Sequence, residues 1–473
     1  MRDLAHLTEA SPVVYRYQGV FSTRDQKKYF QFPFEVKEGA TKIYVHLQYN
    51  KEPKNILYLQ LYDYRRFRGI GKYTANIKKN EIEIFITPTC ASPGALFGNI
   101  PKGRWIAEID SVEVFAICKY HLSIEIYYDN NTVSRFAIKK PTQKKHIVSN
   151  EKRWYRGDLH IHSQESDGKE PVKEIIKAAR ENQLDFIAIT DHNTISSWQY
   201  FKRHKDILLI PGVEVTTPRG HANALGIDDW IDWRIGYRNR TIFDIIKDTR
   251  SKGGIFCINH PRILNHNGQV SWNYQGIDYH QVDAIEIWNA PWLLKNTRSN
   301  EMARSLWNDL LNQGYRLTAV AGSDLHSFDL YAKRLGSLLN YIYCENLSQE
   351  ALLQGIKSGK VFMTAGPMVD FNAIYKGKTY MIGEEIVPSE NQVVEFHIGV
   401  TNTEEELELR IIQDGYILKK YSCPPKEKLN LYFEKVVHDT GWYRIELHHK
   451  ITDDEEDSLV AITNPIYIVL SSQ

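Results

Sequence analysis

The sequence contains little cysteine and almost no net charge. Its five cysteines are scattered, odd in number and without a C-x-x-C pair, so they predict reduced core residues of a cytoplasmic protein and argue against a disulfide framework. The 59 basic and 58 acidic residues nearly cancel, so no strong attraction to nucleic acid or membrane is encoded. Residues 1–20 lack an apolar core of signal-peptide length, and no stretch of about 18 consecutive apolar residues occurs. We therefore expect a soluble, unexported protein with a small-molecule substrate; nothing in the sequence indicates an oligomeric state.

A chain of 473 residues is too long for one ordinary domain, and its patterns divide it into residues 1–150, 151–366 and 367–473. In the first and last parts apolar and polar residues alternate, as in Ile43–Leu47 and Leu407–Ile411, which is typical of half-buried strands. We predict an N-terminal β-sandwich of jelly-roll type and a C-terminal β-sandwich. The basic stretch 139–153 is expected to be a linker, and the acidic residues 453–457 a solvated hairpin tip.

The central part contains short, continuously apolar segments. They predict strands over residues 157–161, 185–190, 207–210, 222–227, 254–258, 284–287 and 317–320, most of them buried on both faces of a parallel sheet. Helical spacing follows Pro171, runs from Ile242 to Gly253, and recurs from Met302 to Gly314. This alternation predicts an α/β domain, barrel-like or doubly wound, whose chemistry lies at the carboxyl ends of the strands.

Histidines and carboxylates lie at or just after the ends of these predicted strands. His160 and His162 are two residues apart in an apolar run, so on a strand both imidazoles point to one face. Asp324 and His326 repeat this spacing. Together with five similar residues they form a set of nine: His160, His162, Asp167, His192, Glu214, His221, His260, Asp324 and His326. Imidazole and carboxylate bind borderline divalent metals, and burying them unpaired is costly. The set therefore predicts a metal site.

These motifs resemble those of the PHP superfamily. The segments that carry the resemblance are Gly157–His162, Ser166–Gly168, Thr190–Asn193, Pro211–Val215, Gly220–Asn223, Asn259–Pro261 and Gly322–His326. Within the superfamily, the chain is most similar to the CehA/McbA-type metallohydrolases, in which a β-rich domain precedes the barrel. The resemblance spans about residues 154–367. It implies a distorted (β/α)7 barrel between the two predicted β-sandwiches.

The resemblance also implies three metal positions, with two to three zinc, manganese or iron ions per chain. The three ligand sets it implies, named here the first, second and third sets, are His160, His162, Glu214 and Asp324; Glu214, His221 and His260; and Asp167, His192 and His326. Glu214 would bridge two positions. Asp167 stands where many relatives have histidine. Because its oxygen is a harder ligand, we expect the third ion to be weaker, or to favour manganese or iron over zinc.

Residues beside these ligands are candidates for supporting roles. Asp191 is predicted to orient His192 or a bound water. Arg219 and Arg262 could hold an anionic substrate group, although ordinary loop solvation explains them equally well. Glu286 and Asn289 end another predicted strand and could touch the substrate.

Three functions remain open from the sequence. Clustered dications lower the pKa of water and hold the oxygens of an electrophile, which suits phosphate esters best. We therefore predict a metal-dependent hydrolase, first of all a phosphoesterase acting on a small or nucleotide-like phosphate. Hydrolysis of a carbamate, amide or ester, as in the CehA/McbA type, would use the same ions. The third hypothesis is a carbohydrate- or surface-binding protein with an inactive barrel, against which the complete ligand set argues.

Overall fold

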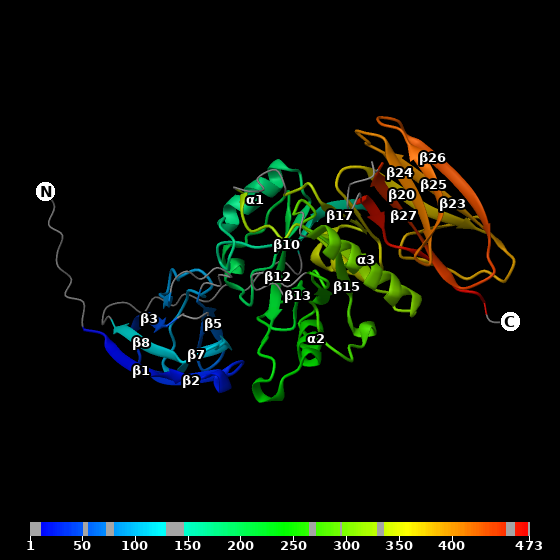
Figure 1. The fold of residues 1–473 in the computed structure, drawn as a ribbon. Coiled ribbons are helices and arrows are strands. Elements are labelled where there is room, and N and C mark those ends of the chain that lie inside the picture. Colours follow the sequence, from blue (N-terminus) through cyan, green and yellow to red (C-terminus); the bar gives the residue numbers. More distant parts are fainter. Residues whose placement is uncertain are drawn as a thin grey trace.

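A computed structural model describes residues 11–50, 55–71, 80–128, 146–263, 271–293, 296–328, 335–450 and 459–471. Figure 1 shows the N-terminal part, in blue and cyan, and the C-terminal part, in orange, on opposite sides of the green central part. Strands dominate the described chain. Residues 139–145 of the predicted linker and the predicted acidic tip at 453–457 lie outside the described residues.

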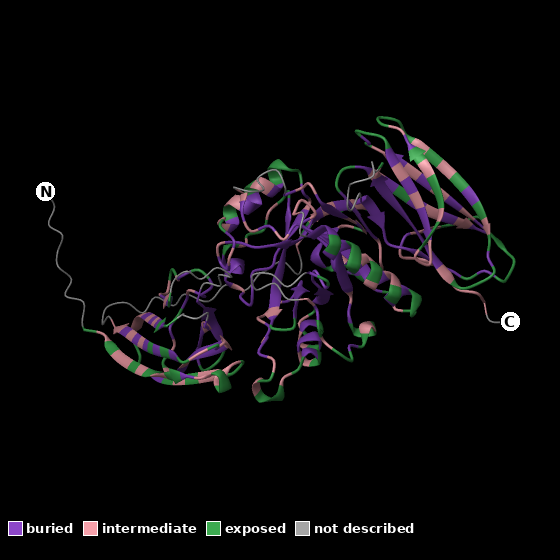
Figure 2. Cartoon of the chain, viewed as in Figure 1, coloured by how far each residue is buried: buried purple, intermediate pink, exposed green. Residues whose placement is uncertain are grey.

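The N-terminal part consists of two four-stranded antiparallel sheets that share one apolar core. The first has the order β1 (Val13–Phe21), β8 (Cys118–Tyr128), β3 (Ala40–Tyr49), β6 (Glu81–Ile86), and the second β2 (Tyr29–Val36), β7 (Gly103–Glu113), β4 (Ile56–Tyr62), β5 (Phe67–Ile70). Alternate residues of β3, namely Ile43, Val45 and Leu47, are fully buried in this core. Figure 2 shows the resulting alternation of buried and exposed residues along these strands. The predicted half-buried strands are confirmed here.

The central sheet curls until its two ends meet. In spatial order its strands are β16 (Thr318–Gly322), β15 (Ala284–Asn289), β14 (Ile255–Ile258), β13 (Gly220–Leu225), β12 (Leu208–Thr217), β11 (Phe186–Ile189) and β10 (Arg153–Ile161). The residues that follow β16 return to the end of β10. The Asp324 N–H donates to the His160 carbonyl, and the His162 N–H to the Leu325 carbonyl, both at 2.9 Å. This meeting brings the Asp324–His326 segment beside His160 and His162.

The prediction of an all-parallel central sheet is wrong for β13. This strand pairs antiparallel with both β12 and β14, whereas β10–β11–β12 and β14–β15–β16 are parallel. Only Pro218 and Arg219 separate β12 from β13, and so short a connection makes a hairpin, because a parallel crossover needs a dozen or more residues. The continuous apolar runs arise because the strands are buried on both faces, whichever way they pair.

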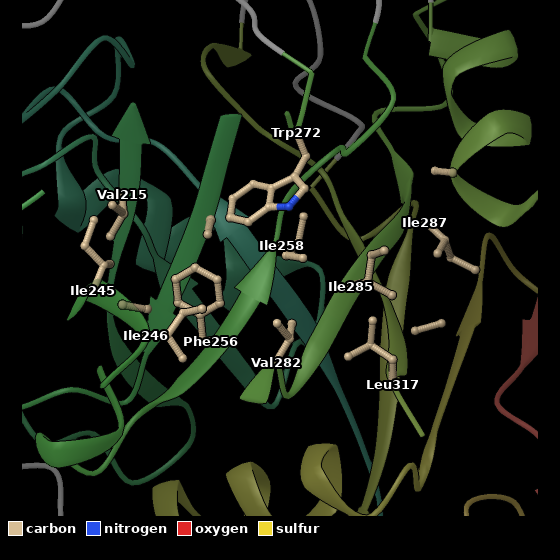
Figure 3. Packing of buried hydrophobic residues seen from close by; sticks show 14 of the residues in the cluster. Val215, Ile245, Ile246, Phe256, Ile258, Trp272, Val282, Ile285, Ile287 and Leu317 are labelled. Atoms are coloured by element: carbon tan, nitrogen blue, oxygen red, sulfur yellow. The ribbon is translucent and has the colours of Figure 1, made fainter. Parts of the chain in front are cut away.

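Of the four central helices in the described residues, the first three pack on the outer face of this sheet, whereas the last contributes Leu352, Leu353 and Ile356 to the core on its other face. The bounds of the four helices are α1 (Val172–Glu181), α2 (Ile242–Ser251), α3 (Thr297–Asn312) and α5 (Gln349–Lys357). Figure 3 shows Ile245 and Ile246 of α2 near Phe256 of β14. The neighbouring Ile255 and Cys257 belong to a second core on the other face of β14. Pro171 is the N-cap of α1, one residue before the predicted first turn, and Met302, predicted to lie on the apolar face of α3, is 40% exposed.

Helices do not follow every central strand. Between β11 and β12 the chain forms the 3-10 helix η3 (Ser196–Tyr200), and η5 (Tyr279–Gln281) lies between β14 and β15. Another two short 3-10 helices are η1 (Thr23–Asp25) and η4 (Tyr237–Asn239). In the part of the chain that is described, no helix has the length and apolar character needed to cross a bilayer. All five cysteines are free, and Cys90 is exposed although we expected a core position.

The C-terminal part continues the central sheet. Strand β17 (Leu339–Cys344) pairs with β10 and β19 (Val361–Thr364), and β19 pairs with β28 (Leu459–Thr463) across the predicted boundary at residue 366. Beyond β28 the sheet includes β27 (Gly441–His449), β24 (Leu407–Gln413), β25 (Tyr416–Cys423), β29 (Ile466–Ile468) and β22 (Glu385–Ile386). A separate sheet has the order β21 (Lys378–Met381), β20 (Met368–Tyr375), β23 (Val393–Thr401), β26 (Leu429–Val436). Both pack on one apolar core. A small pair, β9 (Ile147–Ser149) with β18 (Leu347–Ser348), completes the described strands.

Candidate metal centre

The nine predicted ligands lie together at one rim of the central sheet. His160, Glu214 and His221 are on β10, β12 and β13. The remaining six follow strand ends: His162 and Asp167 after β10, His192 after β11, His260 after β14, and Asp324 and His326 after β16. In four groups of three or four of these residues, all ligand atoms lie within 4.8 Å of one another. The strands end at a common rim, and this explains why residues far apart in sequence converge.

The first set centres on a close pair of imidazoles. The Nε2 atoms of His160 and His162 are 3.1 Å apart. Glu214 places Oε1 3.4 Å from His160 Nε2 and Oε2 3.3 Å from His162 Nε2. Asp324 Oδ1 lies 3.4 Å and 3.1 Å from the same two nitrogens. Both imidazole nitrogens therefore lie near two carboxylates, and His160, His162 and Glu214 come close enough together to share one divalent ion.

The third set lies next to the first and also includes His162. Asp167 Oδ1 is 3.6 Å from His192 Nε2 and 3.3 Å from His326 Nε2. His162 Nδ1 is 3.9 Å from the same oxygen, and its ring stacks against those of His192 and His326. His326 is the most accessible member, with 38% of its side chain exposed, whereas that of Asp167 is 13% exposed. Solvent therefore reaches the cluster from the side of the third set.

In the second set, the grouping of the ligand residues differs from the grouping that the family resemblance implies. Glu214 Oε1 lies 3.2 Å from both His221 Nδ1 and His260 Nε2, so both imidazoles reach the same oxygen. The closest groups, however, join His221 with His192 and Glu214, and His260 with His160 and Asp324. Glu214 contacts imidazoles of all three sets, since Oε2 is also 3.0 Å from His192 Nδ1. It is the central carboxylate of the cluster.

Several buried polar atoms of the cluster have no hydrogen-bond partner in the described part of the protein, and bound metal ions would satisfy them. Within the described residues, buried atoms without a hydrogen-bond partner include His162 Nδ1, Asp167 Oδ1, Glu214 Oε2, both His221 nitrogens and His260 Nδ1. An unsatisfied buried polar group costs about 1–3 kcal/mol, so several at one place need an explanation. Nitrogen and carboxylate oxygen are ligands of zinc, manganese and iron. The donor set and its geometry therefore fit bound divalent ions.

The electrostatics of the cluster favour charged carboxylates and protonated imidazoles in the metal-free protein. Burial raises the pKa of Glu214, but His160, His192 and His221 lower it well below its usual value. Burial lowers the pKa of His162, but hydrogen bonds with Asp324 and Glu214 outweigh this and raise the pKa to about 10. For His221, burial dominates and lowers the pKa. An incoming ion must therefore displace protons from some of these imidazoles.

Glu286 lies behind the cluster, not at its mouth. It is 2% exposed, and its Oε1 is 3.0 Å from His160 Nδ1. Its Oε2 accepts from the His260 backbone N–H at 2.8 Å and from Asn289 Nδ2 at 3.1 Å. Glu286 and Asn289 are both buried and contact protein groups, and their expected contact with a substrate stays a prediction. The sequence could have indicated that Glu286 contacts other polar groups, because a charged residue inside a buried strand needs a polar partner.

Asp191 contacts two serines, and its predicted role of orienting His192 or a bound water stays a prediction. Its carboxylate accepts from the Ser163 N–H and Oγ, both at 2.8 Å, and from Ser166 Oγ at 2.7 Å. Both serines belong to the loop between His162 and Asp167. His192 Nδ1 instead contacts Thr216 Oγ1. Asp191 therefore holds the loop that carries Asp167.

The two candidate arginines are at the surface. Arg219 occupies the β12–β13 turn and Arg262 follows His260, and both are exposed. In the described ranges, no ion pair or side-chain hydrogen bond joins either guanidinium to the nine ligand residues. Neither arginine is part of the cluster itself.

Residues 158–288 match the family model of the PHP domain. The match covers the first seven of the nine ligand-type residues, from His160 to His260. Two ligands, Asp324 and His326, lie beyond it and join the site through the return of the chain to β10.

Several solved structures are similar to this chain. One is a two-domain protein containing a predicted PHP-like metal-dependent phosphoesterase from Bacteroides vulgatus ATCC 8482, which is 15% identical with a TM-score of 0.38, covering 70% of this chain and 100% of that chain. Another is an amidohydrolase from Chromobacterium violaceum with bound sulfate and no metal, 17% identical with a TM-score of 0.25, covering 36% of this chain and 87% of that chain. The third is the CARDB domain of a Pyrococcus furiosus protein in complex with di-metal ions, 18% identical with a TM-score of 0.16, covering 22% of this chain and 96% of that chain. No curated protein matches the sequence.

Proposed function

We propose that this protein is a metal-dependent hydrolase with up to three divalent ions, and that it acts first of all on phosphate esters. The observation that supports this is the convergence of nine imidazoles and carboxylates on one rim, with buried atoms that only a further ligand would satisfy. A purely structural cluster would pair these groups among themselves, because unpaired buried polar groups are destabilising. The complete set also argues against a binding protein with an inactive barrel.

Different ligand sets would bind the inner ions and the outer ion, and the outer set would face the substrate. The first and second sets, which share Glu214, would hold the inner ions, since their side chains are almost fully buried. The third set would hold an outer ion at the accessible side, where His326 is exposed. Bound divalent ions lower the pKa of water at the site and neutralise charge that develops on the substrate. Substrate would approach from the third set, past Asp167 and His326.

Phosphate esters suit this arrangement because their transition state carries charge on several oxygens. Three cation positions can compensate more of that charge than one carbonyl oxygen develops. Hydrolysis of a carbamate, amide or ester, as in the CehA/McbA type, is the alternative, and the β-rich domain before the PHP domain favours this subgroup. Arg219 and Arg262 are proposed as anchors for an anionic part of the substrate, because both are exposed beside loops that carry ligands.

Further parts of this proposal concern the fold and the setting. We infer that the curled central sheet is a distorted (β/α)7 barrel flanked by two β-sandwiches. The chain would then consist of three domains, at residues 1–150, 151–366 and 367–473. The antiparallel β13 would be the main distortion of the barrel. We propose zinc, manganese or iron as the metals, a small molecule as the partner, and the cytoplasm as the location, where free thiols remain reduced.

A substrate panel with controlled metal content tests the proposal. The purified chain is stripped with a chelator, reconstituted separately with manganese, iron or zinc, and assayed on phosphomonoesters, phosphodiesters, oligonucleotides and aryl carbamates. We expect metal-dependent release of phosphate or of the alcohol from a phosphate ester. Turnover of carbamates alone would favour the alternative chemistry. A protein that takes up no transition ion would contradict the metal centre itself.

A further inference from the structure

The ligands of the third set are less firmly held by the strands than those of the first. His160 and Glu214 lie within β10 and β12. Asp167 follows the end of β10 by six residues, and His192 follows the end of β11 by three. Their positions therefore depend on two loops, residues 162–168 and 190–195. A metal site tolerates little displacement of its ligands, so something must fix these loops.

The N-terminal domain contacts both loops through one glycine. The Gly94 N–H donates to Glu165 Oε2 at 3.1 Å, and Thr194 Oγ1 donates to the Gly94 carbonyl at 2.9 Å. Glu165 and Thr194 are 2% and 0% exposed, and each lies two residues from a ligand of the third set, Asp167 and His192 respectively. One peptide segment of the N-terminal domain thus joins the two loops.

This segment is itself rigidly held. The Ile70 N–H donates to the Gly94 carbonyl at 3.1 Å, and the Leu96 N–H to the Arg68 carbonyl at 2.8 Å. Gly94 has a φ of +86°, and a Cβ there would lie 2.4 Å from the Ile70 carbonyl oxygen, so only glycine fits. The segment is therefore a fixed support.

A second contact reinforces the His192 loop. Phe67 of β5 stacks on Trp230 with ring centroids 4.7 Å apart and an interplanar angle of 4°. The Trp230 indole N–H donates to the carbonyl of Asn193, the residue after His192, at 3.3 Å. The Asn193 side chain in turn bonds the backbone of Thr216. The N-terminal domain therefore reaches the His192 loop directly through Gly94 and indirectly through Trp230.

We propose that the N-terminal domain completes the third metal position, because Gly94 holds the two loops that carry Asp167 and His192 through Glu165 and Thr194. This inference depends on the proposed metal centre. Glu165 and Thr194 are positioning residues and not ligands. The first set is held by β10 and β12 and by the main-chain bonds of His162 and Asp324, so loss of the domain contact is expected to remove one class of bound ion and to leave the others.

The test counts ions in the full-length chain. Glu165→Ala and Thr194→Val are loaded with manganese, dialysed and analysed by elemental analysis, and stepwise affinities are measured by calorimetry. We expect one ion fewer per chain, or a weakest affinity reduced by roughly tenfold or more, the range seen when partners of metal ligands are lost. Glu165→Gln keeps an acceptor for the Gly94 N–H and is expected to retain the wild-type ion count.

Tyr237→Phe is the matched control. It removes another interdomain hydrogen bond, from Gln31 Nε2 to the Tyr237 hydroxyl at 2.8 Å, away from both loops, and is expected to bind all ions. Far-UV circular dichroism and melting temperature establish folding, and Thr194→Val, the milder change, decides if Glu165→Ala does not fold.

The possible outcomes separate this inference from the proposed function. Wild-type ion content together with wild-type affinities in both loop variants overturns the inference alone. An equal loss of every ion from the folded loop variants, or the loss of an ion from Tyr237→Phe, also overturns it. A wild-type chain with two ions overturns it while leaving a dinuclear hydrolase. A wild-type chain without ions overturns the proposed function as well.

Discussion

Replacing Glu286 with glutamine tests whether the cluster is a metal site prepared by residues behind it. The carboxylate accepts from His160 Nδ1 at 3.0 Å, from the His260 N–H at 2.8 Å and from Asn289 Nδ2 at 3.1 Å. The bond to Nδ1 keeps the proton on that nitrogen and leaves His160 Nε2 free to bind an ion. Glutamine has nearly the same size but only one acceptor oxygen. Either His160 or His260 therefore loses its hydrogen-bond acceptor.

The magnitude follows from the type of bond lost. A hydrogen bond to a buried charged group contributes about 1.5–3 kcal/mol. If the whole loss appears in the free energy of metal binding, the dissociation constant increases roughly ten- to hundredfold. Measured effects of removing such supporting partners fall in about the same range. We expect Glu286→Gln to remain folded and to lose affinity for the ion of the first set by that factor.

The assay is a competition titration with a chromophoric chelator, followed by elemental analysis. Glu384→Gln is the control, because it makes the same change in a carboxylate that also accepts from a backbone N–H, that of Met381 at 3.0 Å, outside the cluster. Gly322→Ala gives an independent perturbation, since its Cβ would lie 2.0 Å from Glu286 Oε1 and force that carboxylate to move. Wild-type affinity in both Glu286→Gln and Gly322→Ala would refute the argument.

Four other predictions follow from the same site. His162→Ala should abolish turnover and leave both β-rich domains folded, as judged by activity and circular dichroism; an active variant would remove His162 from the machinery. Asp167→His replaces a hard oxygen by nitrogen and should shift the third position toward zinc in a zinc–manganese competition. Metal uptake at pH 7 should release protons and strengthen with rising pH, because the pKa of His162 is raised to about 10; an enthalpy that does not vary with buffer ionisation would contradict this. Chelation should lower the melting temperature, and manganese should restore it, because ions bind only the folded cluster; an unchanged melting temperature would argue against bound ions.

Much of the site was predictable because each ligand lies beside an apolar strand. The spacing of His160 and His162 and its repeat at Asp324 and His326 depend only on local sequence and strand geometry. The structure brings all nine residues together, although their roles as ligands remain predictions. The strands themselves could also be predicted, since burial on both faces gives a continuous apolar run.

The parts that could not be predicted depend on contacts between distant residues. Strand direction was one, because the apolar run of β13 is the same in either orientation and only the short turn at Pro218 and Arg219 distinguishes them. The partners of Asp191 were another, since Ser163 and Ser166 are brought to it by the fold of a loop. The contact of Gly94 with Glu165 joins residues that are 71 apart in the sequence. Local patterns carry no information on such pairs.

The two β-rich domains are attached to the central domain in different ways, and this difference bears on their roles. The C-terminal domain shares a continuous hydrogen-bonded sheet with β10 through β17, β19 and β28. Asn464 also bonds both backbone groups of Ala319 in β16, at 2.8 and 2.9 Å, and so closes the edge of the strand before Asp324. Movement of this domain would break main-chain ladders, so it acts as part of the frame.

The N-terminal domain, in contrast, shares no strand with the central sheet in the ranges described, and it meets the centre through a loop and side chains. Contacts of this kind can separate without breaking a sheet, and those of Gly94 reach the loops of Asp167 and His192. The first set is held by strands of the frame and by the main-chain bonds that join the ends of β10 and β16, whereas the third depends on this separable contact. A change in domain contact would therefore alter the outer ion before the inner ones, at the side from which we propose that substrate enters.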